Sequence, residues 1–176
     1  MLPNTYEEQE CSVARALEVV GERWTMLIVR DALLGVRRFE DFQARLGVSR
    51  PVLSDRLAQL VDHGVLERGR YQRRPDRYEY TLTDRGQRLW PAVAALSQWA
   101  AAELLPDGAP RHFHHRGCAS AVHAEVRCPD CGAELEPADV LSSPAPGAAV
   151  SRAEHIAEPV RTALASEREL LAPVRG

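Results

Sequence analysis

The sequence predicts a mainly α-helical domain with one small β-hairpin, followed by a short extension rich in cysteine and histidine. Three observations predict this fold class. Apolar residues recur at helical spacing through most of the first hundred residues. The spacing of the apolar residues then changes to alternation with polar residues on either side of a proline-containing turn, as expected for two paired strands. Beyond about residue 105, histidine and cysteine become frequent.

The composition is that of an ordinary soluble globular protein. The chain has 176 residues, 45% of them hydrophobic and 27% charged, which allows one compact domain with appendages. No apolar run approaches the roughly 20 residues of a membrane helix. The first ten residues are acidic and polar, unlike a secretory signal. We therefore expect a cytoplasmic protein.

Four short helices are expected before the hairpin. Ser12 can cap the first and Ser49 the fourth, and Pro51 lies where a missing N–H costs little. The four helices span about Ser12–Val20, Arg23–Leu34, Phe39–Leu46 and Ser49–His63. Their expected inward side chains are Val13, Ala16, Leu17 and Val20 in the first, Trp24, Leu27, Ile28 and Ala32 in the second, Phe39, Phe42 and Leu46 in the third, and Val52, Leu53, Leu57 and Leu60 in the fourth.

The hairpin is expected from strands Val65–Tyr71 and Arg77–Leu82, joined by a turn at Gln72–Asp76. Thr83 then caps a long helix, Asp84–Leu105, in which Pro91 predicts a kink. Two short helices joined by Gly-Val ahead of a capped helix match a helix-turn-helix. With the hairpin as a wing, the predicted architecture is a winged helix-turn-helix.

Positive charge is concentrated in the middle of the chain. The formal net charge is −3, yet residues 11–105 carry 15 arginines against 12 acidic residues. Lysine is absent, which suggests a GC-rich coding bias, so the positions of the arginines matter more than their number. Five of them fall between Arg68 and Arg77, a bias that a surface hairpin does not need for its stability.

This pattern predicts contacts to double-stranded DNA. The exposed face of the fourth helix can reach base edges, and the hairpin can follow phosphates or enter the minor groove. The alternative for the helix is a solvated face with an ordinary charge mixture. The candidate DNA-binding residues are Arg38, Ser49, Arg50, Ser54, Arg56, Arg70, Arg73, Arg74 and Arg77.

Several ordered motifs resemble the HxlR family of bacterial regulators, which are relatives of MarR. The matching segments are Cys11–Ala14, Gly21–Thr25, Arg38–Phe42, Gly47–Ser49, Gly64–Arg68 and Tyr78–Thr83. The resemblance covers about residues 9–100. It implies a homodimeric transcriptional repressor that binds an inverted-repeat operator. It also implies that the protein is not an enzyme and that the helices Ser12–Val20 and Asp84–Leu105 pair the protomers. Trp24 is expected in the core, and Trp90 and Trp99 at the dimer interface.

Cys11 resembles the N-terminal cysteine with which some family members sense oxidants or electrophiles. A helix N-terminus favours the thiolate, whereas the nearby Glu7, Glu8 and Glu10 oppose it. The alternative is a half-buried small hydrophobic residue. Both interpretations remain open at this point.

The extension contains two metal-ligand pairs, His115 with Cys118 and Cys128 with Cys131. Together they supply the four ligands of a structural zinc site. A short segment with few apolar residues needs such a metal site to stabilise its fold. His112, His114 and His123 are alternative fourth ligands. A knuckle without metal would also fit this spacing.

Two different function classes are weighed against a DNA-binding regulator. One is a thiol redox or zinc-dependent interaction protein that uses Cys128 and Cys131, although the βαβ setting of redox CxxC motifs is missing. The second is a winged helix used only for protein contacts, which would leave the arginine-rich hairpin unexplained.

The predicted organisation has four parts. Residues 1–10 form an N-terminal arm, 11–105 the DNA-binding and dimerisation domain, and 106–140 the zinc-binding extension. Residues 141–176 are expected to be a flexible linker and a tail, either weakly helical around Val160, Leu164 and Leu171 or disordered.

Overall fold

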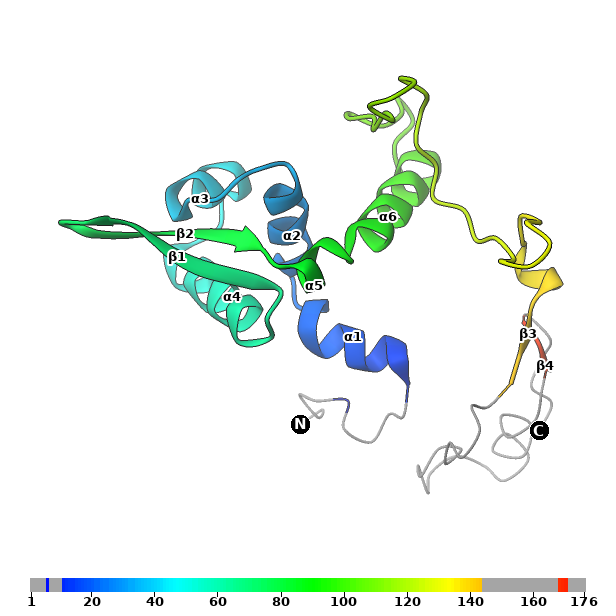
Figure 1. Ribbon diagram of the computed structural model, residues 1–176, viewed down its shortest axis with the longest axis horizontal. Coiled ribbons are helices and arrows are strands. Elements are labelled where there is room, and N and C mark those ends of the chain that lie inside the picture. The colour runs from blue at the N-terminus through cyan, green and yellow to red at the C-terminus, as the bar shows by residue number, and fades with distance from the viewer. Residues whose placement is uncertain (1–5, 7–10, 144–167, 171–176) are drawn as a thin grey trace. The chain divides into compact units, whose positions relative to one another are not determined.

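The computed structural model of the chain describes residues 6, 11–143 and 168–170. The chain divides into two compact units, residues 19–124 and residues 1–18 with 125–176, and each unit is described on its own. The helices and strands up to residue 103 are α1 (Ser12–Val20), α2 (Thr25–Leu33), α3 (Phe39–Leu46), α4 (Arg50–Asp62), β1 (Leu66–Arg73), β2 (Asp76–Leu82), α5 (Asp84–Gln87) and α6 (Trp90–Glu103). This order confirms the predicted winged helix-turn-helix (Figure 1).

The core of the unit 19–124 is formed where α2, α3 and α4 meet the base of the hairpin. Ile28, Phe42, Leu53 and Leu57 are fully buried there. Each contributes about 1.5–3 kcal/mol through its removal from water. Trp24 packs half-buried against this core, as predicted. Its backbone takes a left-handed φ of 81°, so α2 begins at Thr25 and not at Arg23.

The helical faces differ from the prediction at several apolar positions. Val13 and Leu17 of α1 are 64% and 41% exposed, and Leu27 of α2 is 38% exposed. Ala16 and Val52 are also exposed. Helical spacing identifies residues that share a face, but it does not say whether the same chain covers that face.

The hairpin is longer than predicted, because its strands run to Arg73 and resume at Asp76. The strands pair antiparallel from Leu66 opposite Leu82 to Arg73 opposite Asp76. The register shifts between Arg70 and Gln72, which leaves one extra residue on β1, a bulge that increases the local twist. The tip of the hairpin projects beyond α3 and α4 (Figure 1).

The predicted long C-terminal helix is divided into α5 and α6. Thr83 caps α5 as predicted, since its hydroxyl accepts a hydrogen bond of 3.1 Å from the Gly86 N–H. The division falls at Arg88 and Leu89, ahead of Pro91, which has no N–H to continue the helical ladder. Proline in the first turn suits a new helix start better than a helix interior. The prediction of one kinked helix was therefore wrong at this point.

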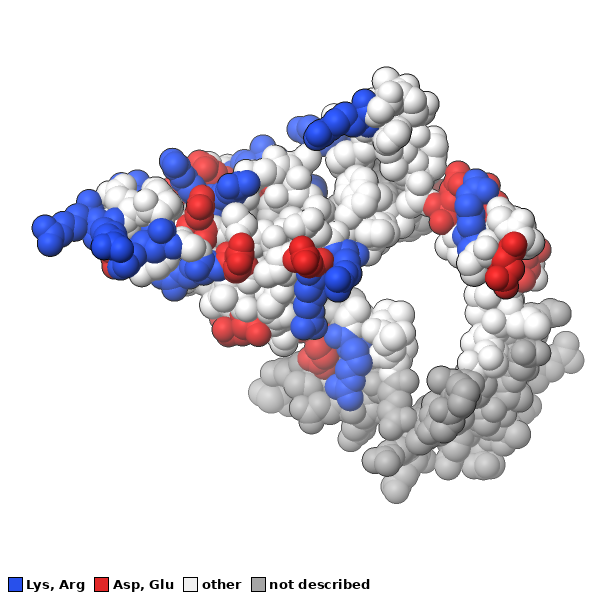
Figure 2. All heavy atoms as spheres, in the orientation of Figure 1, with Lys and Arg blue, Asp and Glu red and all other residues white. Residues whose placement is uncertain are grey.

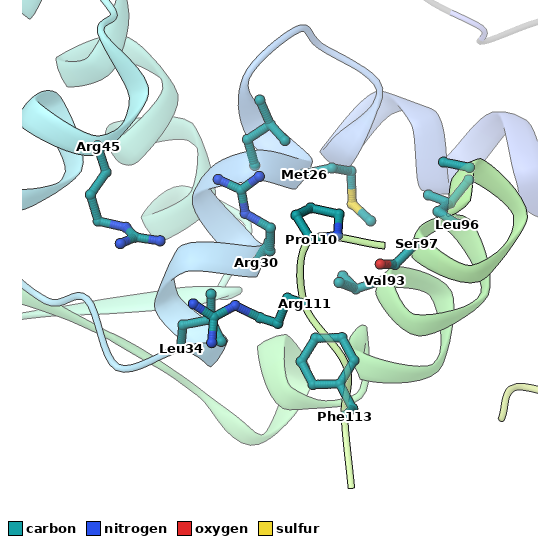
Figure 3. A pocket seen from close by; sticks show the side chains of 12 residues that line it. Met26, Arg30, Leu34, Arg45, Val93, Leu96, Ser97, Pro110, Arg111 and Phe113 are labelled. Carbon is teal, nitrogen blue, oxygen red and sulfur yellow. The ribbon is translucent and has the colours of Figure 1, made fainter. Parts of the chain in front are cut away.

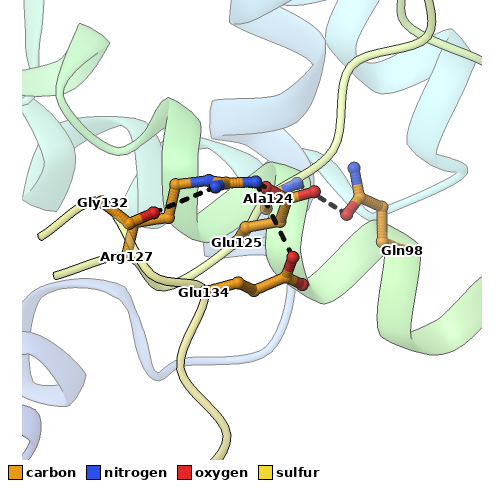
Figure 4. Close-up of polar contacts among 6 residues, drawn as sticks. All are labelled: Gln98, Ala124, Glu125, Arg127, Gly132 and Glu134. Atoms are coloured by element: carbon orange, nitrogen blue, oxygen red, sulfur yellow. Dashed lines mark hydrogen bonds and ion pairs between the residues drawn. The ribbon is translucent and has the colours of Figure 1, made fainter.

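The first part of the extension packs on α6. Gln98 of α6 donates a hydrogen bond of 2.8 Å to the Val122 carbonyl. It also accepts one of 2.8 Å from the Ala124 N–H (Figure 4). Phe113 packs edge-to-face on Trp90 at 4.8 Å between ring centroids. Trp90 therefore has a partner within its own chain, whereas the sequence analysis assigned it to the dimer interface.

The second unit contains a tight turn around Cys128 and Cys131. The Gly132 N–H donates to the Cys128 carbonyl at 2.9 Å, and Gly132 has a φ of 74° that favours glycine. Arg127 holds this turn through ion pairs with Glu125 and Glu134 and a 3.3 Å hydrogen bond to the Gly132 carbonyl (Figure 4).

A short 3₁₀ helix, η1 (Pro137–Asp139), follows the turn, and β3 (Leu141–Ser142) then pairs antiparallel with β4 (Arg168–Glu169). The start of the predicted linker is therefore a strand. The helix expected around Val160, Leu164 and Leu171 lies outside the described residues. None of the described helices is long and apolar enough to cross a membrane.

Candidate nucleic-acid interface

The first turns of α4 present a polar face. Ser49 occupies the N-cap position as predicted, but its side chain makes no capping hydrogen bond. Ser49, Arg50 and Ser54 are exposed, whereas Leu53 and Leu57 hold the opposite face in the core. The exposed hydroxyls and guanidinium group lie beside a helix N-terminus, where partial positive charge favours an anion.

Arg50 is held against α3 by two contacts. Its guanidinium group lies 4.8 Å from the centroid of the Phe39 ring and donates a 3.1 Å hydrogen bond to Oε1 of Gln43. These contacts restrict the rotamers of a long side chain while leaving other N–H donors free. Arg50 can therefore act as a positioned hydrogen-bond donor.

The structure favours a structural role for Arg56. Its side chain is only 18% exposed and forms ion pairs with Glu22 at 3.4 Å and Asp55 at 3.5 Å. It also donates a 2.6 Å hydrogen bond to Gln59. The sequence could not distinguish this arginine from Arg50, because the ion pair with Glu22 depends on how the loop before α2 lies against α4.

The tip of the hairpin carries guanidinium groups without acidic partners. Arg73, Arg74 and Arg77 are exposed and form no ion pair with any residue that the structure describes. Arg70 differs, because it lies 3.5 Å from Asp76 across the strands. Figure 2 shows the basic side chains gathered at this end of the hairpin. Unneutralised charge on a projecting ribbon is suited to phosphate contacts.

Arg38 connects the start of α3 to the hairpin. Its guanidinium group lies 4.7 Å from the centroid of the Tyr71 ring, at the bulge of β1. The backbone next to it accepts a 2.8 Å hydrogen bond, from the Tyr80 N–H to the Arg37 carbonyl. The segment before α3 is thus joined to the middle of the hairpin, with Arg38 exposed at the junction.

A cluster of ion pairs around one buried carboxylate links α2 to α3. Asp31 is fully buried and receives hydrogen bonds from Arg30 at 2.9 Å and from Arg45 at 3.2 Å. Contact with the Asp31 carboxylate, first through the hydrogen bond and then through its charge, raises the pKa of Arg45. The sequence analysis missed this cluster. The available signal was an acidic residue next to an arginine in a mostly apolar helix, because a buried carboxylate requires a partner.

Cys11 lies immediately before α1. Its side chain is exposed, and its carbonyl accepts the 3.0 Å hydrogen bond from the Arg15 N–H that opens the helix. In the single chain this thiol is therefore accessible to a small oxidant, as a sensing role requires.

The four predicted zinc ligands form two local pairs. Nδ1 of His115 lies 3.2 Å from Sγ of Cys118. Hydrogen bonds to Ser120, and then to His115, lower the pKa of the Cys118 thiol to about 7. In the other unit, the backbone of Cys131 and Asp130, followed by the Cys131 side chain, lowers the pKa of Cys128. Among the described residues, no three His, Cys, Asp or Glu side chains converge to hold a metal ion. Because the pairs belong to different units, the four-ligand site remains a prediction.

Comparisons with known proteins agree with this architecture. A family model described as HxlR-like helix-turn-helix matches residues 19–107. The chain is 44% identical over 137 residues to HTH-type transcriptional regulators of Mycobacterium bovis and Mycobacterium tuberculosis, which covers 77% of this chain and 87% of those relatives. This match is longer than the segment 19–107, so the likeness continues into the flanking segments.

Two solved structures extend the comparison. One is PA1607, described as a transcription factor, with 38% identity and a TM-score of 0.67, covering 74% of this chain and 92% of that chain. The other is the redox regulator HypR in its reduced form, with 27% identity and a TM-score of 0.50, covering 52% of this chain and 92% of that chain.

Proposed function

Since the chain belongs to the HxlR-like helix-turn-helix family of transcriptional regulators, we propose that it binds an inverted-repeat operator as a homodimer and represses transcription from it. The observation that carries this proposal is the set of unpaired guanidinium groups at the hairpin tip, Arg73, Arg74 and Arg77. They lie on the same unit as the exposed polar face of α4.

In this proposal α4 is the recognition helix. Arg50 and Ser54 contact base edges in the major groove, and the α4 N-terminus faces a phosphate. Arg73, Arg74 and Arg77 contact the sugar-phosphate backbone or the minor groove beside it. Arg38, exposed beside the middle of the hairpin, contacts a phosphate between the two.

Apolar side chains left exposed by one chain support the homodimer. Leu96 and Trp99 of α6 are 54% and 58% exposed, and Leu104 and Leu105 follow them. In α1, Val13 and Leu17 are exposed as well. Such large apolar groups on successive helical turns are typical of an interface. A second copy that covers them would create a two-fold dimer with two recognition helices.

The proposal is tested by selecting bound duplexes from a random library and measuring binding to the selected site. Arg50→Ala should weaken operator binding by about 1–3 kcal/mol and lower the preference for one base pair in each half-site. Arg85→Ala, which removes an exposed arginine of α5, is the matched control. Sedimentation should find two chains per duplex. A monomer on DNA, or equal losses in both variants, would contradict the proposed arrangement.

A redox response through Cys11 is a second proposal. It is supported by the exposure of the thiol and by the likeness to HypR, itself described as a redox regulator. Diamide should change operator affinity in the wild type and not in Cys11→Ser. Equal sensitivity of the two proteins would remove Cys11 from this role.

Structural zinc held by His115, Cys118, Cys128 and Cys131 is a third proposal. Its support is that each pair of ligands is already brought together within its own unit. One zinc per chain is expected by metal analysis of the purified protein, falling to a fraction of that in Cys128→Ser. Absence of zinc after purification in zinc-supplemented medium would favour a knuckle without metal.

A further inference from the structure

A pocket lies between α2, α6 and the first residues of the extension, within the unit 19–124. Its volume is about 530 Å³, in the range of sites that bind small organic molecules. Met26, Val93 and Phe113 contribute apolar walls, and Arg30, Arg45 and Arg111 contribute guanidinium groups (Figure 3). We propose that this pocket binds a small carboxylate with an aromatic or branched apolar body.

The apolar part of the pocket is preformed. Val93 is buried in the core, and Phe113 is fixed by its edge-to-face contact with Trp90. The segment that carries Phe113 is in turn held by the two hydrogen bonds between Gln98 and residues 122 and 124. Rigid walls reduce the ordering cost of binding an apolar group.

The charge of the pocket is positive. Arg30 and Arg45 share one carboxylate, that of Asp31, so this cluster keeps an excess of one positive charge. Their side chains remain 39% and 45% exposed, with N–H donors not used by Asp31. Arg111 adds a third guanidinium group and forms no ion pair with any described residue. None of the described residues that line the pocket is acidic.

This combination selects the class of ligand. A carboxylate can accept two parallel hydrogen bonds from a guanidinium group, and a neighbouring apolar surface strengthens them by excluding water. A purely apolar ligand would leave Arg111 without an anionic partner, and an inorganic anion would leave the apolar walls unfilled. An arylalkanoate satisfies both parts of the pocket.

Calorimetric titration of the full chain with 3-phenylpropanoate tests the proposal, with 3-phenylpropanamide as the neutral analogue. Saturable binding of one acid per chain is expected, with the amide weaker by about tenfold or more. Arg111→Ala should also weaken the binding of the acid by about tenfold. Arg85→Ala, which removes an exposed arginine outside the pocket, should bind the acid as the wild type does.

Arg111 is exposed, so its replacement should leave the far-ultraviolet circular dichroism unchanged, and a loss of binding can then be assigned to the site. Binding should weaken with added salt in the wild type and less so in Arg111→Ala. The inference is overturned if the acid shows no saturable binding. It is equally overturned if acid and amide bind alike, or if Arg111→Ala keeps the wild-type affinity.

Discussion

The salt dependence of DNA binding should report the contribution of the hairpin tip directly. The change is the double substitution Arg73→Ala with Arg74→Ala, at two exposed positions without ion pairs among the described residues. No intramolecular pairing is lost, so the free energy of unfolding should change by less than about 0.5 kcal/mol. Any effect on DNA binding then belongs to the contact with DNA.

The magnitude follows from counterion release. Each phosphate contact contributes roughly 0.9 to the steepness of log K against log salt. In the proposed dimer these two arginines make four contacts, so their removal should reduce the slope by about 3.6. Over a fourfold increase in salt, the wild type should then lose about 100-fold more affinity than the variant.

Fluorescence anisotropy with a labelled duplex of random sequence, titrated over a range of potassium chloride concentrations, measures both slopes. Arg85→Ala with Arg88→Ala removes the same number of exposed arginines from the α5 region and serves as the charge-matched control. An equal reduction of slope in both double variants would show that net charge, and not the hairpin, determines binding. An unchanged slope in the hairpin variant would refute the reasoning altogether.

Three further predictions concern stability and can be checked by urea unfolding. Gly86→Ala should lower the free energy of unfolding by about 1–3 kcal/mol, because its new Cβ would lie 2.2 Å from a backbone oxygen. Gly69→Ala is the control, because the nearest atom there lies at 4.0 Å, and its stability should stay within about 0.5 kcal/mol of the wild type. Arg56→Ala should lower the free energy of unfolding by about 1 kcal/mol and change operator affinity by less than about twofold. A loss of operator binding without a loss of stability would instead identify Arg56 as a DNA contact. Asp31→Asn should lose about 1–3 kcal/mol because two arginines lose their carboxylate, and unchanged stability would mean that the cluster is not structural.

Much of the helix-turn-helix could be predicted because its signals are local. The limits of α3 and the buried face of α4, Leu53, Leu57 and Leu60, follow from helical spacing and from Gly47, which ends α3 in a left-handed conformation. The pairing of strands across Pro75 was predicted for the same reason, although its strands are longer.

The remaining features depend on groups distant in the sequence. Helical spacing placed Leu27 on an inward face, yet no part of its own unit covers it completely. Asp31 and Arg56 each have one charged partner outside their own helix, Arg45 and Glu22 respectively, and a single sequence does not reveal such pairs. The pocket could not be predicted either, because it needs the extension to lie along α6.

Thr83 has a consequence for how such a regulator could tolerate variation in its binding sites. Its hydroxyl donates to the Gly64 carbonyl at 2.6 Å, just after α4, and its own N–H donates to the Val65 carbonyl at 3.1 Å. Thr83 thus connects the end of α4, the base of the hairpin and the beginning of α5. In the proposed dimer, α4 and the hairpin of each subunit would therefore move as one body. Differences in spacer length between two half-sites would then be accommodated by the contact between the subunits or by the DNA itself.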